Sequence, residues 1–391
     1  MKKYNLFVVI LLWGIFAISA TANSLDSNVP DPFQRFDNDS KLTIDYRDLD
    51  SLLDAVVLNT GRSDRKKADS FRAQTGTRMK IKVNRATVNE GNRFYYEVFA
   101  NNPENQQTLH RIRTRLESIP SVMPLEKFSR DEQLAYWLNL YNTTMLDEIV
   151  KVYPTPELEE LLLGNDSIVS KKTLVISGVP LSLNDIQFNI LRQNYDNNPL
   201  IIYGLYQGII GGPNIRKNAY TGKYVYNDLI ENALEFVNSN RGTESKNSRI
   251  FRVSSFYERN AMYFPDFDAD LTKHLLTYLE GDERVELQKA TRIDADIDDW
   301  TVTDLYGTTR NLGGSLANNA AALEGAVAGN SSSKLTAKSV AAGRYTPEMI
   351  AHLNELNQKN AKERSGTVTI EELGQAPEEM ESTDQDDKGQ E

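Results

Sequence analysis

Hydrophobic residues recur with helical spacing in several stretches of the chain. Apolar side chains at positions i, i+3, i+4 and i+7 line up on one face of a helix, and Leu49, Leu53 and Val56 follow this spacing. Leu109, Ile112, Leu116 and Ile119 repeat it, and we expect that helix to stop at Pro120 because proline lacks an N–H. The pattern predicts helices over residues 49–57, 109–119, 129–153, 183–195, 226–237 and 270–279.

The clearest predicted helix begins at Ser129. Ser129 and Glu132 form the sequence of a capping box, in which each side chain accepts a hydrogen bond from a backbone N–H at the helix start. Pro154 then closes the pattern. The sequence therefore predicts a long, well-capped helix.

Shorter apolar runs are typical of strands. "TLVISGVPLSL" (173–183) predicts a hairpin about Ser177 and Gly178, and "RIFRVSSF" (249–256) predicts a strand. "PLIIYGLYQ" (199–207) is a continuous apolar run, which favours a buried strand that leads into the glycine-rich turn "GIIGGPN".

Together these elements predict one main domain over residues 41–305. We expect an α+β fold, in which a small, mainly antiparallel sheet is packed by several helices, and α/β stays open as an alternative. Residues 23–40 are polar and contain two prolines, so we interpret them as a linker. Beyond residue 306 aromatic residues become rare and the end is strongly acidic, which predicts a mostly disordered tail over residues 306–391.

The first residues are typical of a secretory signal peptide. Lys2 and Lys3 precede a short apolar run, and Ala20-Thr21-Ala22 gives a small-residue cleavage site after Ala22. No later stretch is long and apolar enough to span a bilayer. We therefore expect residues 1–22 to be removed and the mature protein, without a transmembrane helix, to be periplasmic or secreted.

Composition narrows the possible chemistry. A net charge of −11 argues against a nucleic-acid binder, which needs clustered Lys and Arg, and the chain has no cysteine for disulfides or thiol catalysis. Residues 59–85 are locally basic and fit either an anionic partner or, as we favour, a strand at 79–83 with one solvent face.

No motif of the common catalytic or metal-binding kinds is present. His110, His274 and His352 lack ligand spacing, so we expect His110 and His274 to be ordinary surface or boundary residues. The acidic run 294–299 lacks the glycine and glutamate of a calcium loop, which favours a solvated loop over an irregular calcium site. We assign no catalytic residue and expect no metal or cofactor.

Five segments, in this order, resemble the domain-of-unknown-function family 547. They are "SRDEQLAYWLNLYN" (129–142), "PLSLNDIQFNILR" (180–192), "NPLIIYGLYQGIIGGPNIRKNAYT" (198–221), "VSSFYERN" (253–260) and "DDWTV" (298–302). The resemblance extends over about residues 41–305 and implies an exported bacterial member of that family.

The chain departs from the family pattern where chemistry would be expected. Many members carry Glu and His at the positions of Gln187 and Phe188, His at Ile202, Cys at Gln207 and often Cys at Gly212. Carboxamides neither attack an acyl group nor move its proton near neutral pH. Should the family contain thiol enzymes of a papain-like or transglutaminase-like kind, the resemblance implies that this member is not one of them.

We therefore favour a non-catalytic exported protein that binds a peptide, a saccharide or an envelope protein. A hydrolase or acyl transferase of the same descent that uses non-thiol residues is the main alternative, and a purely structural role in the envelope is the third. Amide and aromatic side chains are typical of such binding sites, although the helix residues among them also fit core packing and backbone anchoring. The candidate ligand-binding residues are Trp137, Asn139, Asn142, Gln187, Tyr203, Tyr206, Gln207 and Gly208.

Overall fold

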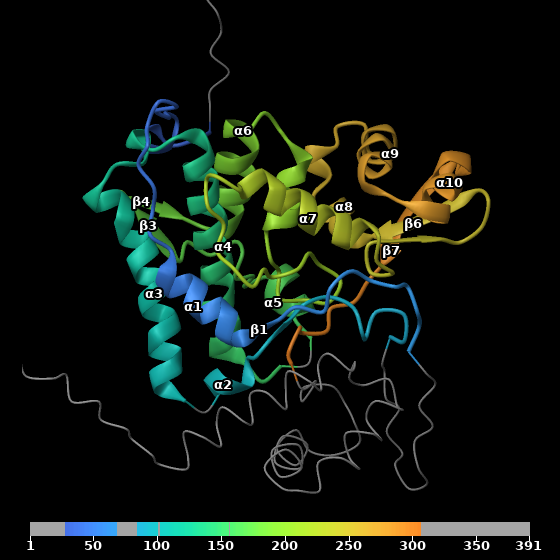
Figure 1. Ribbon diagram of the computed structural model, residues 1–391, viewed down its shortest axis with the longest axis horizontal. Helices are drawn as coiled ribbons and strands as arrows, with labels where there is room; N and C mark the ends of the chain where they lie inside the picture. The colour runs from blue at the N-terminus through green and yellow to red at the C-terminus, as the bar shows by residue number, and fades with distance from the viewer. Residues whose placement is uncertain (1–27, 69–83, 101, 156, 306–391) are drawn as a thin grey trace, which may run out of the picture.

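The long helix α4 (Arg130–Val152) forms the centre of the fold (Figure 1). The computed structural model describes residues 28–68, 84–100, 102–155 and 157–305. Nearly all side chains of α4 are buried, and the helix packs against α3 (Pro103–Val122), α7 (Val225–Val237) and the π-helix η3 (Asp185–Leu191). The other helices are α1 (Arg47–Val56), α2 (Glu97–Ala100), α5 (Glu159–Leu163), α6 (Arg192–Asn194), α8 (Ser255–Arg259), α9 (Phe267–Tyr278), α10 (Gly281–Lys289) and the 3-10 helices η1 (Asp31–Phe33), η2 (Leu125–Lys127), η4 (Pro199–Gly204) and η5 (Ala261–Tyr263).

The sheets are small. Strands β1 (Val57–Leu58) and β2 (Arg93–Phe94) pair antiparallel, as do β3 (Leu174–Ile176) and β4 (Val179–Leu181). A three-stranded sheet has the order β5 (Thr243–Ser245), β6 (Ile250–Ser254), β7 (Arg292–Ile297), antiparallel first and then parallel. Helices dominate and the strands are short and mostly antiparallel, so the predicted α+β class is confirmed.

Of the two hydrogen bonds of the predicted capping box at the start of α4, only the one accepted by Ser129 is formed. Ser129 Oγ accepts the N–H of Glu132 at 3.2 Å. The Glu132 carboxylate does not return to the cap and instead accepts the N–H groups of Ile44, at 2.9 Å, and Gly222, at 3.1 Å. Because the carboxylate is taken up by two remote segments, Glu132 fixes both of them to the beginning of the central helix.

The helix was predicted to stop at Pro120, and this prediction is wrong. Helix α3 continues to Val122, and the carbonyl that Pro120 leaves without an N–H donor is that of Leu116. Tyr136 of α4 donates its hydroxyl to Leu116 O at 3.2 Å. A side chain of the neighbouring helix thus replaces the missing backbone donor, so the proline is tolerated in the last turns.

The predicted strand over residues 199–207 is wrong. Pro199–Gly204 form the 3-10 helix η4, which Asn198 begins by accepting the N–H of Leu200 at 3.0 Å. Side-chain amides satisfy its carbonyls, since Asn142 donates to Gly204 O at 2.9 Å and Asn232 to Tyr203 O at 3.0 Å. The run is buried, as expected, but its backbone bonds to side chains instead of a neighbouring strand.

The other predicted elements can be compared with the described residues. The hairpin is confirmed, with Ser177 and Gly178 both at positive φ, and part of the acidic run predicted as a loop is strand β7. Of the predicted linker, Val29 and Phe33 are buried in the core. The signal peptide, the predicted strand 79–83 and the tail from 306 lie outside the described residues.

None of the helices in the described ranges has both the length and the apolar character that crossing a membrane requires.

Candidate ligand-binding cavity

A cavity of about 360 Å³ lies between the middle of α4, the end of α5 with the segment after it, η3, and the end of α8. This volume is at the small end of the usual range for ligand pockets, about 300–1,000 Å³. The side chains around it divide into polar and apolar groups. Its lining residues are Tyr141, Leu162, Leu163, Gly164, Ser167, Val169, Ser170, Asn184, Gln187, Phe188, Gln207, Arg259 and Asn260.

Local capping sets the elements that carry the polar lining residues. Asp185, at the start of η3, accepts the N–H of Ser182 at 2.7 Å and its hydroxyl at 2.5 Å. Ser254 caps α8 by accepting the N–H of Phe256 at 3.2 Å. A π-helix is rare and is often found at functional sites, and here it carries Gln187 to the cavity wall.

Hydrogen bonds hold the carboxamides of the cavity in fixed orientations. Gln187 Nε2 donates to Asn260 Oδ1 at 2.5 Å, and Asn260 Nδ2 donates to Phe256 O at 2.7 Å. Gln207 Oε1 accepts from Arg259 Nη2 at 3.1 Å. These bonds leave the Oε1 atom of Gln187 and the Nε2 atom of Gln207 without a hydrogen-bond partner among the described residues.

Arg259 is the cation of the cavity. Its guanidinium lies over the Trp300 ring at 4.5 Å, and Nη1 donates to Ser255 Oγ at 2.6 Å. Among the described residues no carboxylate lies within ion-pair distance of it, although Asp298 and Glu258 favour its charged form electrostatically, and the Ser255 hydroxyl donates to Asp298. Burial lowers the pKa of Arg259 to about 10, so the group stays protonated at neutral pH.

The turn that carries Gln207 is fixed by a segment far along the chain. Thr303 N donates to Gly208 O at 2.9 Å, Ile210 N donates to Thr301 O at 2.9 Å, and Ile209 forms a bridge with Val302. Gly208 has a φ of 77°, which a residue with a Cβ rarely adopts. The position of Gln207 is therefore set by backbone bonds and not by its own side chain alone.

Comparison with known protein families gives a match over part of the chain. Residues 125–237 match the model of the family described as a protein of unknown function, DUF547. The chain carries a DUF547 region. Searches of curated proteins and of solved structures find no match to the chain.

The DUF547 region supplies most of the cavity but not its charged side. Tyr141, Gln187 and Gln207 lie within the matched residues, whereas Arg259, the last residue of α8, and Asn260, which follows it, lie beyond them. All five segments that resemble the family meet here, because each contributes a lining residue or, for the last segment, the Trp300 ring beneath Arg259.

The family positions that departed from the pattern separate into two groups. Gln187, Phe188 and Gln207 line the cavity, and Gly212 lies next to Gln207, with a virtual Cβ 3.6 Å from Gln207 Oε1. Ile202 is fully buried in η4 and is not among the lining residues. Positions 187, 188 and 207 therefore share one lining, and position 202 does not belong to it.

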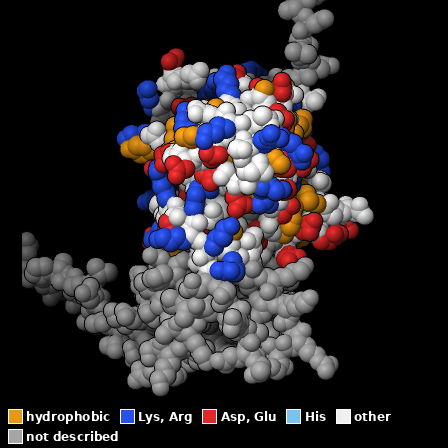
Figure 2. All heavy atoms as spheres, turned by 90° about the vertical axis from the view of Figure 1, so that its right-hand side faces the viewer, with side chains coloured by type: hydrophobic (Ala, Val, Ile, Leu, Met, Phe, Trp, Pro, Cys, Tyr) orange, Lys and Arg blue, Asp and Glu red, His pale blue; other side chains and the backbone are white. Residues whose placement is uncertain are grey.

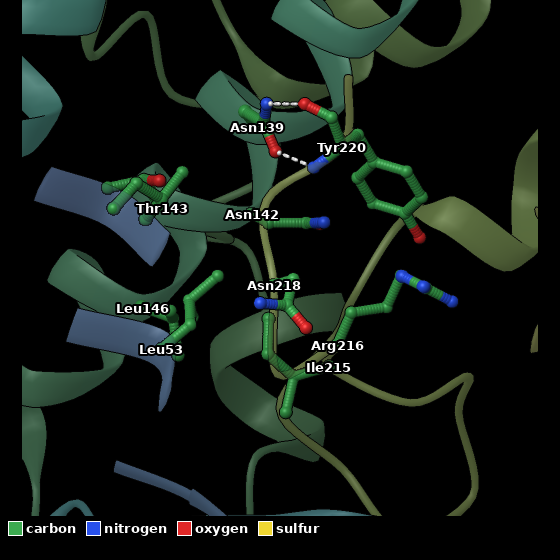
Figure 3. Close-up of a pocket in the computed structure, with 10 residues that line it drawn as sticks. Leu53, Asn139, Asn142, Thr143, Leu146, Ile215, Arg216, Asn218 and Tyr220 are labelled. Atoms are coloured by element: carbon green, nitrogen blue, oxygen red, sulfur yellow. Dashed lines mark hydrogen bonds between the residues drawn. The ribbon is translucent and has the colours of Figure 1, made fainter. Parts of the chain in front are cut away.

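Asn139 and Asn142 of the DUF547 region anchor backbone, as the alternative interpretation proposed. Asn139 forms two hydrogen bonds with Tyr220, its Nδ2 to the carbonyl at 2.8 Å and its Oδ1 to the N–H at 2.9 Å (Figure 3). Asn142 similarly joins Gly204 O and Tyr206 N, each at 2.9 Å. The hole beside them is about 10 Å³, the size of roughly one water molecule.

The remaining candidate residues lie in the core. Trp137 packs edge-on against Phe33, with ring centroids 5.1 Å apart. The Tyr206 hydroxyl meets those of Tyr96, at 3.0 Å, and Thr303, while the Tyr203 hydroxyl meets that of Tyr257 at 3.1 Å. Gly208 contacts Ile149 and Leu158, so of the eight candidates Gln187 and Gln207 are the ones that line the cavity.

Sequence reasoning did not select Arg259 or Asn260. Both stand in a quoted segment, "VSSFYERN", but an arginine near a helix end is usually a surface residue. One signal in the sequence was Trp300 in the segment "DDWTV", because an aromatic ring can bind a guanidinium, and Arg259 lies over this ring.

The face over α9, α10, β6 and β7 carries mixed charges (Figure 2). Lys and Arg side chains lie among Asp and Glu, and Arg252 pairs with both Glu244 and Asp296 at 2.6 Å. Within the described ranges, no group of three or more His, Cys, Asp or Glu residues is arranged to hold a metal ion.

Proposed function

We propose that the chain is a non-catalytic ligand-binding protein whose site is the 360 Å³ cavity. The observation that supports this most is the lining itself, in which the carboxamides Asn184, Gln187, Gln207 and Asn260 and the guanidinium of Arg259 surround one space. Carboxamides and guanidinium groups give oriented hydrogen bonds and change no proton near neutral pH. Such a set recognises a ligand without reacting with it.

The titratable groups of the cavity favour binding over acid–base catalysis. Besides Arg259, the one other titratable lining side chain is Tyr141, and burial raises the pKa of its phenol well above the usual value. A general base needs a pKa near the working pH. Tyr141 therefore stays protonated and serves as a hydrogen-bond donor.

We further propose that the protein acts outside the cytoplasm, on the basis of the signal-like residues 1–22. The ligand is then a peptide, a saccharide or an exposed part of an envelope protein. Peptide groups offer C=O and N–H, saccharides offer hydroxyl groups, and amide side chains can form hydrogen bonds with all of them.

A pair of valine variants tests the site. Val169→Trp places an indole in the cavity lining, whereas Val175→Trp adds the same ring on strand β3, where Val175 is 56% exposed and outside the lining. Ligand-observed NMR with a mixture of small carboxylates, amides and saccharides finds binders of the natural chain. Binders of the cavity are expected to be lost in Val169→Trp and kept in Val175→Trp.

Two results would overturn the proposal. One is a set of binders that both variants retain, which would place binding elsewhere. The other is turnover of a bound compound by the natural chain, seen as a new mass, which would make the cavity catalytic.

A further inference from the structure

We propose that the cavity receives the C-terminal residue of a peptide, with its free carboxylate on Arg259 and an apolar side chain against the apolar lining residues. This inference rests on the proposed function and adds the class of ligand. The charge, the unpaired amide atoms and the apolar wall each support it independently.

The charge favours a monoanion. Arg259 is the single cation among the lining residues, two of its N–H groups are taken by Ser255 and Gln207, and the others have no acceptor among the described residues. A carboxylate satisfies a guanidinium with two parallel hydrogen bonds. A phosphate dianion would bring a second charge that no lining side chain neutralises.

The free amide atoms match one peptide group. Gln207 Nε2 is a donor and Gln187 Oε1 an acceptor, and neither has a partner among the described residues. A peptide bond offers one carbonyl and one N–H, so it satisfies both. A saccharide can also form hydrogen bonds with both atoms, but a neutral saccharide has no carboxylate to pair with Arg259.

The apolar wall defines the side chain. Leu162, Val169 and Phe188 line the cavity beside the polar groups. Burial of apolar ligand surface against these side chains is favourable. An aromatic or aliphatic C-terminal residue therefore fits better than a polar one.

The test compares N-acetyl-L-phenylalanine with N-acetyl-L-phenylalaninamide, which differ in the carboxylate alone. Binding to the natural chain is measured by calorimetry and by protein-observed NMR. The acid is expected to bind at least about tenfold tighter than the amide, because the charge-assisted bonds to Arg259 are lost in the amide. Arg259→Gln is expected to abolish this preference, while Arg252→Gln, which changes a surface arginine outside the lining, keeps it.

The outcomes separate the two proposals. Equal binding of acid and amide, lost in Val169→Trp, would overturn the carboxylate inference and leave the binding function standing. A preference for the acid that survives in a folded Arg259→Gln variant would also overturn the inference. Failure of both compounds to bind at millimolar concentration would contradict the inference, while binders from the broader mixture would still support the proposed function.

Discussion

Acidification should destabilise the protein through His274. This side chain is partly buried in α9, where its ring stacks on Tyr203 with centroids 5.6 Å apart and meets Phe264 edge-on at 5.5 Å. Its Nε2 lies 2.9 Å from the Tyr203 hydroxyl. Burial lowers the pKa of His274 from its usual 6.5 to about 4, so the folded protein disfavours the charged imidazolium.

The sign and size follow from the two pKa values. The folded pKa is lower than the unfolded one, so the contribution of neutral His274 is complete above pH 6.5 and is lost progressively as the pH falls from 6.5 to 4. Each pKa unit is worth about 1.4 kcal/mol, and the loss between pH 7 and pH 4 is therefore about 3 kcal/mol.

Urea denaturation at a series of pH values measures this loss. Carboxylates also titrate in this range, so the natural chain is compared with His274→Phe, which keeps an aromatic ring but cannot be protonated. Loss of the hydrogen bond to Tyr203 lowers the stability of the variant by a constant amount. From pH 7 to pH 4 the natural chain should lose about 3 kcal/mol more unfolding free energy than the variant.

A difference that stays constant over this range would refute the reasoning. It would show that His274 has the same pKa in the folded and unfolded states, and that its aromatic surroundings do not exclude the charged form.

Two further changes test the turn beside the cavity. Gly208→Ala should lower the free energy of unfolding by about 2–4 kcal/mol, because a Cβ strains the positive φ, overlaps Ile149 and comes within 2.9 Å of Leu158 Cδ1. Gly178 has a φ of 80° but open space around it, so Gly178→Ala should lower the free energy of unfolding by about 1–2 kcal/mol in the same urea assay. An equal cost for both would contradict the packing at Gly208. Gln207→Cys, the single cysteine of its chain, should react with iodoacetamide at a lower pH than Ser118→Cys on the surface of α3, because Arg259 stabilises the thiolate. Identical pH midpoints would show that Arg259 does not reach the side chain at 207.

Much of the fold could be predicted because helices carry local signals. The apolar stripe of α1, the Ser129 cap and the paired positive-φ residues at Ser177 and Gly178 all act within a few residues of themselves. The run 199–207 was predicted wrongly because its apolar residues are continuous and show no periodicity. Its secondary structure depends on whether its carbonyls accept hydrogen bonds from a strand or from the side chains of Asn142 and Asn232. That choice depends on residues far away in the chain.

The candidate site could be predicted only in part, because the contacts that single out its residues also depend on distant parts of the chain. Gln187 and Gln207 were found through resemblance to the family, and both line the cavity. Asn139 and Asn142 carry the same amide group but form hydrogen bonds with backbone groups. Residue type alone does not distinguish this role from ligand binding. Arg259 becomes distinctive because no described carboxylate pairs with it and because it lies over Trp300, and both are properties of the folded chain.

The most direct test of a binding cavity without chemistry is a single NMR titration of the ¹⁵N-labelled protein with N-acetyl-L-phenylalanine. The side-chain NH₂ signals of Gln187, Gln207 and Asn260 are predicted to shift together and saturably, while the ligand signals remain those of the unchanged compound. Amide signals that stay fixed while others move, or ligand that is converted to a product, would contradict the account.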